Sequence, residues 1–517
     1  MNNLRSRKIA SGAALLLSLS GFAVSTFAQA TSAEEESVEL EKFVVTGSYI
    51  PTTETSFSAG VSPVVRLDRQ VIDQVGLTTA AELLQKITVS NGGSVPISNN
   101  ATGFTPAGTS TSLRGLGPEA TLVLINGRRV APYPVGTSGT TAFVDLNSIP
   151  LAAVNSIEVL KDGASALYGA DAVAGVVNIK MRRGMDGTEM NVMYGNTTTA
   201  DSSEFTASLI TGAQTDKASV MIGFNYYKKN PIFNADRSYS EVPPFLSSNS
   251  SPLNLEITRE AALEAGVPAS ALPAGDDTFF AASPADASND GNTPVNNYLF
   301  GQGRIHTFNF NRDSMAYPIR KNKGIFAFGD RKIFDTENIS IYVDLSYQNT
   351  FTQNELAPSA TGNWGNPGGV ELVIPARTAN PLPLPDGRAR SAVDGAFNPF
   401  NPFNIDLTGG TRARLYEFGN RIYESETDAS MIAFGIKGEN VFDKWNFDAS
   451  YSYSGLDEIS RGTLVSISRF NRVVNQNDPI FDPASDSFIG TTTPYNPFGF
   501  WENEIANNAL VSDFALV

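Results

Sequence analysis

The chain has 517 residues, a formal net charge of −16, one histidine and no cysteine. This acidity argues against binding to a nucleic-acid backbone, which requires clustered positive charge. The residue counts also argue against the common Cys–His and Ser–His–Asp catalytic arrangements, against a disulfide framework and against a histidine-rich metal or haem site. We therefore predict a protein that is not an enzyme, has no cofactor and binds no nucleic acid. Its 44 glycines and 29 prolines, with 17% charged residues, are typical of a turn-rich β-protein.

Residues 1–30 have the order of a cleavable secretory signal peptide. Three basic residues precede an apolar segment over residues 9–24, and Ala28-Gln29-Ala30 has the small residues of a cleavage site. The apolar segment is short and is interrupted by Ser and Gly, so we expect no spanning helix there. An acidic linker over residues 31–55 follows.

Residues 56–183 are predicted to form a small α+β domain of about 125 residues, enough for a core of its own. Thr79-Ala80-Ala81-Glu82 has the pattern of a capping box and predicts the start of a short helix. The Gly-, Ser- and Asn-rich residues 90–112 predict a long exposed loop. Apolar segments predict strands over residues 61–67, 121–125, 129–130, 157–160 and 173–179.

From residue 184 onward, apolar and polar residues alternate with a period of two. The clearest runs cover residues 338–347 and 444–453, and shorter ones cover 190–194, 205–209, 218–227 and 432–436. Each run is about long enough for one tilted transmembrane strand with its polar positions facing a wet interior. A soluble β-sandwich is the alternative, because its strands also alternate.

The connections between these strands favour a barrel. The connections over residues 228–324 and 350–428 are very long and rich in Pro, Asn, Gly and Ser, whereas the links near 196–203 and 438–443 are short. Structureless loops of such length are uncommon in a compact soluble domain. Short turns on one side and long extracellular loops on the other are typical of an outer-membrane barrel, so residues 184–517 are predicted to be antiparallel transmembrane strands.

Four ordered motifs lie in residues 56–183: Leu113-Arg114-Gly115-Leu116-Gly117, then residues 122–129, 157–169 and 172–179. With these motifs the sequence resembles the plug domain of TonB-dependent outer-membrane receptors. The resemblance implies a plug inside a barrel of about 22 strands. The size of the domain agrees with this, because a plug with a radius of gyration of about 14 Å cannot sit inside a barrel of about eight to ten strands, whose interior is filled by side chains. The motif residues singled out are Gly115, Gly117, Asn126, Gly127, Asp162, Gly163, Tyr168, Gly169, Gly175 and Asn178.

Residues 41–48 resemble a TonB box. The segment is β-prone, precedes any possible core, and is flanked by an acidic run and a polar spacer. Such an isolated strand is suited to pairing with the edge of another protein's sheet, and the resemblance implies that this partner is the periplasmic domain of TonB. A disordered tail with some β propensity is the alternative. The box residues are Glu41, Lys42, Phe43, Val44, Val45, Thr46 and Gly47.

Arg114 and Glu158 occupy motif positions where such receptors hold charges that contact the barrel wall. The resemblance therefore implies a latch between plug and barrel that rearranges when TonB pulls. Simple anchoring of the plug, or an ion pair within it, is an equal alternative. Buried charges of this kind must be paired, because breaking a pair costs more than the pair contributes.

Two features of the long loops have simple interpretations. His306 is expected to be a solvated loop residue, since a lone histidine is a poor basis for a metal site. The aromatic residues of 397–403 and 495–499 are expected to pack against the barrel mouth. Stacking on a ligand is the alternative.

The resemblance as a whole implies a receptor of the cell outer membrane that imports a scarce solute into the periplasm, with energy from an inner-membrane complex acting through TonB. Its partners would be TonB, outer-membrane lipid and a small-molecule ligand, such as a siderophore, cobalamin or a glycan. Plug loops over about 91–112 and 131–142 would contact the ligand, together with the long barrel loops. A signalling receptor and a structural or adhesive surface protein are the alternatives.

The strand count falls short of such a barrel. About eight to ten strands can be counted after residue 184, and Val517 does not follow the terminal aromatic strand that these barrels usually have. Open strand edges cannot be satisfied by lipid. We therefore expect a longer natural protein, and we expect the 517 residues alone not to insert stably.

Overall fold

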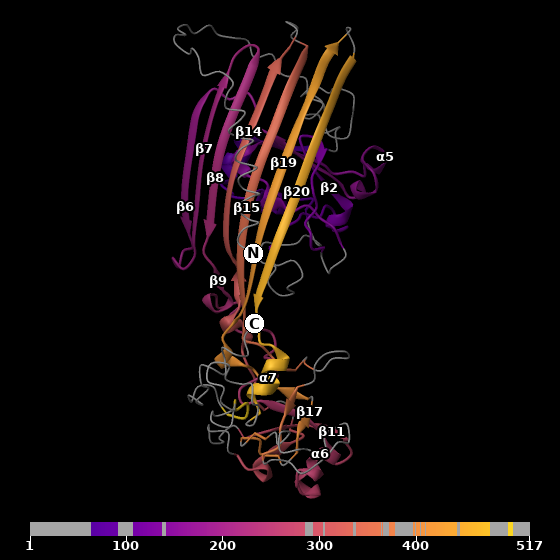
Figure 1. The fold of residues 1–517 in the computed structure, drawn as a ribbon, viewed down its shortest axis with the longest axis vertical. Helices are drawn as coiled ribbons and strands as arrows, with labels where there is room; N and C mark the ends of the chain where they lie inside the picture. The colour runs from indigo at the N-terminus through magenta and orange to yellow at the C-terminus, as the bar shows by residue number, and fades with distance from the viewer. Residues whose placement is uncertain are drawn as a thin grey trace, which may run out of the picture.

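The computed structural model describes residues 64–90, 107–136, 141–284, 293–302, 305–333, 338–362, 364, 372–377, 397–398, 400–403, 405–408, 410–441, 445–475 and 495–499. The predicted signal peptide and box lie outside these residues. The described residues form three parts: the N-terminal domain (64–183), a long sheet of seven strands, and a loop domain formed by the connections at one end of that sheet (Figure 1). Among the described residues, no helix is both long and apolar enough to cross a membrane.

The N-terminal domain contains a mixed five-stranded sheet in the order β1-β4-β5-β2-β3. Strands β2 and β5 are parallel and the other pairs are antiparallel. The five residues of β2 are all buried, as their apolar run predicts. The strands are β1 (Val64–Asp68), β2 (Thr121–Ile125), β3 (Arg128–Arg129), β4 (Val154–Leu160) and β5 (Gly175–Met181).

The described part of the N-terminal domain also contains three short α-helices. They are α3 (Arg69–Val75), α4 (Ala80–Lys86) and α5 (Ser165–Tyr168). Helix α4 starts where the sequence predicts, because the Thr79 side chain accepts a hydrogen bond from the backbone of Glu82 at 3.2 Å. The prediction of an exposed loop over 90–112 is wrong for residues 107–112, which are buried. There Gly108 lies so close to Phe143 that a Cβ would come within 2.7 Å of its ring.

The long sheet is antiparallel, with the strand order β20-β19-β15-β14-β8-β7-β6. Its side chains alternate as predicted: in β15, Tyr342 and Asp344 are buried on one face, whereas Ile341 and Tyr347 are exposed on the other. The predicted order, a small α+β domain followed by antiparallel strands, is confirmed. The strands are β6 (Gly187–Asn196), β7 (Ser203–Gln214), β8 (Ala218–Lys229), β14 (Ile319–Lys332), β15 (Ile339–Leu356), β19 (Arg421–Val441) and β20 (Trp445–Thr463).

Strand β14 was not predicted, and part of it falls inside the predicted loop 228–324. Its segment Ile325-Phe326-Ala327-Phe328 is apolar on both faces, so it lacks the period of two. The reason is packing: Phe326 and Phe328 turn toward the N-terminal domain and are buried there. The second predicted loop is also too wide, because β15 continues to Leu356 and β19 begins at Arg421.

The N-terminal domain packs against one face of the long sheet (Figure 1). Five side chains of the sheet join the core of that domain: Ile210, Met221, Phe326, Phe328 and Met431. The absence of a side chain at Gly223 makes room for Phe326, whose ring would come within 2.3 Å of a Cβ at that position. Two parts distant in sequence thus share one hydrophobic core.

The long connections fold into the loop domain, which has its own hydrophobic core (Figure 1). A four-stranded sheet runs in the order β12-β11-β10-β18, and small strand pairs and helices surround it. The elements are β9 (Ile232–Phe233), β10 (Asn254–Thr258), α6 (Arg259–Glu264), β11 (Thr278–Ala282), β12 (Leu299–Phe300), β13 (Met315–Tyr317), β16 (Val373–Ile374), β17 (Leu407–Thr408), β18 (Thr411–Arg412) and α7 (Ile467–Val473).

The structure corrects two expectations about these connections. His306 is buried, with Nε2 2.8 Å from the carbonyl oxygen of Ser283, so the expectation of a solvated residue is wrong. Burial lowers the pKa of its imidazole. The aromatic residues Phe403, Tyr495 and Phe498 do pack, but in the core of the loop domain.

Both long connections lie at one end of the long sheet, and this agrees with the predicted asymmetry. The antiparallel order also places the short turn over 197–202 at that same end, so the expectation that the short links lie on the other side is wrong for this one. At the opposite end, three residues separate β7 from β8, six separate β14 from β15, and three separate β19 from β20.

Candidate functional site between the N-terminal domain and the long sheet

A buried carboxylate on the long sheet connects it to the N-terminal domain. Asp344 of β15 is 1% exposed, and its Oδ1 accepts a hydrogen bond from Arg183. Its Oδ2 accepts one from Asn126 Nδ2 at 3.2 Å and lies 3.8 Å from Arg128 Nη1. A charge this deeply buried requires such partners. Three side chains of the N-terminal domain therefore depend on one residue of the sheet.

The Arg128 guanidinium extends this network from β15 to β20, a second strand of the long sheet. It lies over the ring of Tyr342, 4.9 Å from the ring centroid, and 3.4 Å from Asp448 on β20. The Tyr342 hydroxyl donates to Asp448 at 2.7 Å. Arginine suits this position because its planar fork can form several hydrogen bonds while stacking on an aromatic face.

A second contact joins Arg320 of β14 to the N-terminal domain. Arg320 is 3% exposed and donates from Nη1 to Asn147 Oδ1 at 2.6 Å. Asn147 Nδ2 in turn donates to Asp145 Oδ1 at 2.8 Å, which also accepts from the Thr109 backbone at 2.9 Å. Burial raises the pKa of the Asp145 carboxyl to about 6, although these hydrogen bonds and Arg320 oppose the shift.

A third cluster lies toward the loop domain. Lys229 Nζ on β8 is 3.6 Å from Glu82 of helix α4 and 3.8 Å from Glu204 on β7. The Thr78 hydroxyl lies within hydrogen-bond distance of both carboxylates. Because Lys229 is mostly buried, the two carboxylates are needed to compensate its charge.

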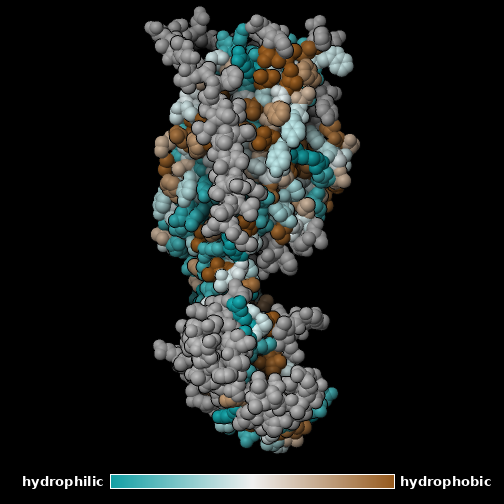
Figure 2. All heavy atoms as spheres, in the orientation of Figure 1, coloured by the Kyte–Doolittle hydropathy of each residue, from teal (hydrophilic) through white to brown (hydrophobic). Residues whose placement is uncertain are grey.

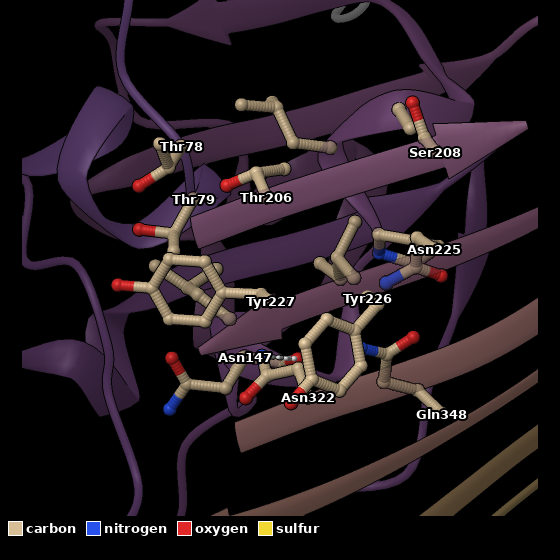
Figure 3. A pocket seen from close by; sticks show the side chains of 15 residues that line it. Thr78, Thr79, Asn147, Thr206, Ser208, Asn225, Tyr226, Tyr227, Asn322 and Gln348 are labelled. Carbon is tan, nitrogen blue, oxygen red and sulfur yellow. Dashed lines mark hydrogen bonds between the residues drawn. The ribbon is translucent and has the colours of Figure 1, made fainter. Parts of the chain in front are cut away.

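A small polar cavity lies between the second and third contacts (Figure 3). Its volume is about 40 Å³, which is room for about two or three water molecules. Four of its lining atoms make no hydrogen bond within the described part of the chain: Thr206 Oγ1, Asn225 Oδ1, Asn322 Oδ1 and Gln348 Oε1. The interface is therefore polar and roomy here, unlike the shared apolar core.

A larger cavity of about 510 Å³ opens beside helix α4, toward the loop domain. The N-terminal domain, the long sheet and the loop domain all line it, through residues that include Glu82, Lys86, Glu204, Lys229 and Tyr317. Its volume is in the range of small-molecule sites. Of the predicted ligand loops, residues 91–106 and 137–140 lie outside the described residues.

The structure places the two predicted latch residues in the N-terminal domain, with described partners in that same domain. Arg114 donates to the carbonyl oxygens of Val173 and Ala174 at 2.9 and 3.2 Å. Glu158 is 3% exposed and lies 4.0 Å from Lys180. The latch role of this pair stays a prediction.

Several predicted motif residues form turns that only certain side chains allow. Asn126 and Gly127 both have positive φ, +50° and +77°, as the predicted tight turn requires. The Asn178 side chain accepts from the Gly127 backbone at 2.9 Å, and Asn126 Oδ1 accepts from the Met181 backbone at 2.9 Å. Positive φ also occurs at Gly115, Gly117, Gly169 and Gly175.

The remaining predicted motif residues lie near the α5 helix. Asp162 accepts a hydrogen bond from the Gly163 backbone at 2.9 Å. The Tyr168 carbonyl accepts one from Arg129 at 2.6 Å.

Residues 58–176 match the family model described as the TonB-dependent Receptor Plug Domain. The chain carries the plug domain of the TonB-dependent receptor family. The described plug domain is thus the part that packs on the face of the long sheet that holds Asp344 and Arg320.

Solved structures of siderophore receptors from Acinetobacter baumannii are similar at low identity. BauA, the ferric preacinetobactin receptor, is 12% identical, with 78% of this chain and 48% of BauA covered and a TM-score of 0.35. PirA is 15% identical, with 83% and 51% covered and a TM-score of 0.33. PiuA is 14% identical, with 82% and 49% covered and a TM-score of 0.33. The chain spans about half the length of these three structures.

Of the residues that join the plug domain to the long sheet, Asn126 was predicted as a motif residue, whereas Arg183, Arg320 and Asp344 were not predicted as site residues. Arg128 lies inside a motif, and Asp344 is the one charged residue in the alternating run over residues 338–347, at one of its polar positions. A charged residue in the middle of a strand was therefore the available signal. Pairing it with Arg183 required the fold, because the two are 161 residues apart.

Proposed function

We propose that the protein is a TonB-dependent receptor of the outer membrane that binds a scarce solute on the side of the loop domain and imports it into the periplasm. The observation that carries this proposal is a plug domain packed on the face of an antiparallel sheet that holds Asp344 and Arg320, whose opposite face exposes apolar side chains such as Phe224 and Phe434. Hydrophobic side chains are visible on that opposite face over the upper part of the sheet (Figure 2). In this proposal the sheet is part of a barrel wall and the apolar face contacts lipid.

The 510 Å³ cavity beside α4 is the proposed entry for the solute. It faces the loop domain, and it is lined by both charged and aromatic groups that can orient a small molecule.

The contacts of Asp344 and Arg320 hold the plug domain in the resting state. Moving the plug requires exchange of these hydrogen bonds for others, and the polar cavity beside them offers space for water to take part. TonB would supply the force by pairing with residues 41–47 as an added strand.

A proline in the predicted box tests this function. Val44→Pro or Val45→Pro removes one backbone donor of the added strand and distorts it. We expect solute uptake by intact cells to collapse while solute binding to the cell surface persists. Val38→Pro, which lies before the box, is the matched control. Normal uptake in the box variants would refute the assignment, and a structural or adhesive protein would show no TonB-dependent uptake at all.

A further inference from the structure

Three lysines gather on the face of the long sheet that is turned away from the plug domain. Lys228 of β8 lies directly opposite Lys321 of β14, and Lys323 lies two residues further along β14, opposite Tyr226. All three side chains are exposed. Like charges directly opposite one another destabilise a sheet, so folding gives no reason for this arrangement.

No carboxylate of the described residues lies within ion-pair distance of these lysines. The nearest acidic groups on the same face and at the same level are Glu426 and Asp428 of β19, two strands away from β14. Two strand spacings are about 10 Å. Asp428 also accepts hydrogen bonds from Tyr347 and Asn349 at 2.6 and 2.8 Å. The three lysines therefore form a patch of uncompensated positive charge.

The patch lies at the border of an apolar surface. Next along the strands, away from the loop domain, Phe224 and Leu209 are exposed on the same face. Aromatic rings lie at this border. The ring centroids of Phe205 and Tyr226 are 6.2 Å apart, and Lys321 Nζ is 5.4 Å from the Phe351 ring centroid. Lysines at such a border can lay their carbon chains on apolar surface and extend the ammonium groups into the headgroup layer.

We propose that Lys228, Lys321 and Lys323 bind the phosphate groups of a membrane glycolipid in the leaflet next to the loop domain. Its acyl chains lie along the apolar face that includes Leu209 and Phe224. The patch offers positive charge where headgroups lie, which matches a headgroup carrying more than one phosphate. This inference rests on the proposed outer-membrane location.

The test uses the protein purified from outer membranes in mild detergent, titrated with diphosphoryl lipid A and analysed by native mass spectrometry. We expect the variant Lys228→Gln/Lys321→Gln/Lys323→Gln to bind lipid A at least about tenfold more weakly. The corresponding triple Arg variant should bind as the wild type does. Arg331→Gln is the matched control, because Arg331 is an exposed cation on the same face of β14 at its opposite end.

Dephosphorylated lipid A and inorganic phosphate separate the possible sources of binding. The proposal requires weak binding of both, and equal binding of dephosphorylated lipid would overturn it. Unchanged lipid A binding by the triple Gln variant, or an equal loss in Arg331→Gln, would also overturn it. Cell fractionation and solute uptake in the same strains separate this result from the proposed function: without outer-membrane location or TonB-dependent uptake, the receptor assignment fails independently of lipid binding.

Discussion

Arg183 of the plug domain donates a hydrogen bond to Asp344 in the middle of β15, and this carboxylate is almost fully buried. Asn126 and Arg128 of the plug domain contact the same carboxylate. The plug domain therefore holds a charge of the long sheet that neither part could bury alone.

Replacing this carboxylate should loosen the plug domain. In Asp344→Ala, Arg128 and Arg183 lose their common partner, and we expect a loss of about 3 kcal/mol of stability. Intact cells should then become more sensitive to large antibiotics, and a susceptibility assay measures this. Asp457→Ala removes an exposed carboxylate of β20 and is the control. Equal sensitivity of the two variants would contradict the assignment.

Arg114→Ala tests the latch predicted from the sequence. It removes two hydrogen bonds to the carbonyls of Val173 and Ala174, so we expect a smaller loss, about 1 to 2 kcal/mol, and increased leak of large antibiotics. The same susceptibility assay compares it with Asp344→Ala. Unchanged permeability would leave Arg114 with an anchoring role inside the plug domain and would exclude a latch at that residue.

Asp145 should make stability depend on pH. Its pKa in the folded state is raised from 3.8 to about 6, so the folded state binds the proton more tightly than the unfolded state does. The stability that protonation contributes is fully present below the unfolded pKa of 3.8 and is lost as pH rises through about 6. The difference amounts to about 3 kcal/mol.

Thermal unfolding of wild type and Asp145→Asn between pH 3.5 and 7 measures this effect. The wild-type protein should lose stability relative to the variant as pH rises, because the variant has no proton to lose at this position. A constant difference between the two proteins across this range would show that Asp145 has an ordinary pKa.

Gly175→Ala should prevent correct packing of the plug domain. A Cβ at this position would lie 2.3 Å from the carbonyl oxygen of Leu160, and φ is +137°. We expect a loss of several kcal/mol, roughly 3 or more, measured by chemical denaturation. Gly127→Ala is the control: φ is +77° there but the space around it is open, so about 1 kcal/mol is expected. Similar losses in both variants would mean that backbone strain, and not the close approach, is decisive.

Local signals in the sequence were sufficient for much of the plug domain. The helix at Thr79 and the turn at Asn126-Gly127 depend on neighbouring residues, so their patterns could be recognised without the fold. The alternation of β15 and β20 was equally visible, because one face of each strand is polar and the other apolar. Strand β14 was not predicted, because Phe326 faces the core of another domain and breaks the alternation. The burial of His306 was not predicted either, because it depends on the folding of the loop around it.

The plug motifs, the glycines of its turns and the period of two in most strands of the long sheet can be recognised in the sequence, because they depend on backbone geometry and on the nearest neighbours along the chain. Which charges meet depends instead on how distant elements pack. Asp344 has its partners in residues more than 150 positions away, and Lys228 and Lys321 became one patch through the register of two strands. Long-range electrostatic contacts are set by how separate elements pack, and no local pattern encodes that packing.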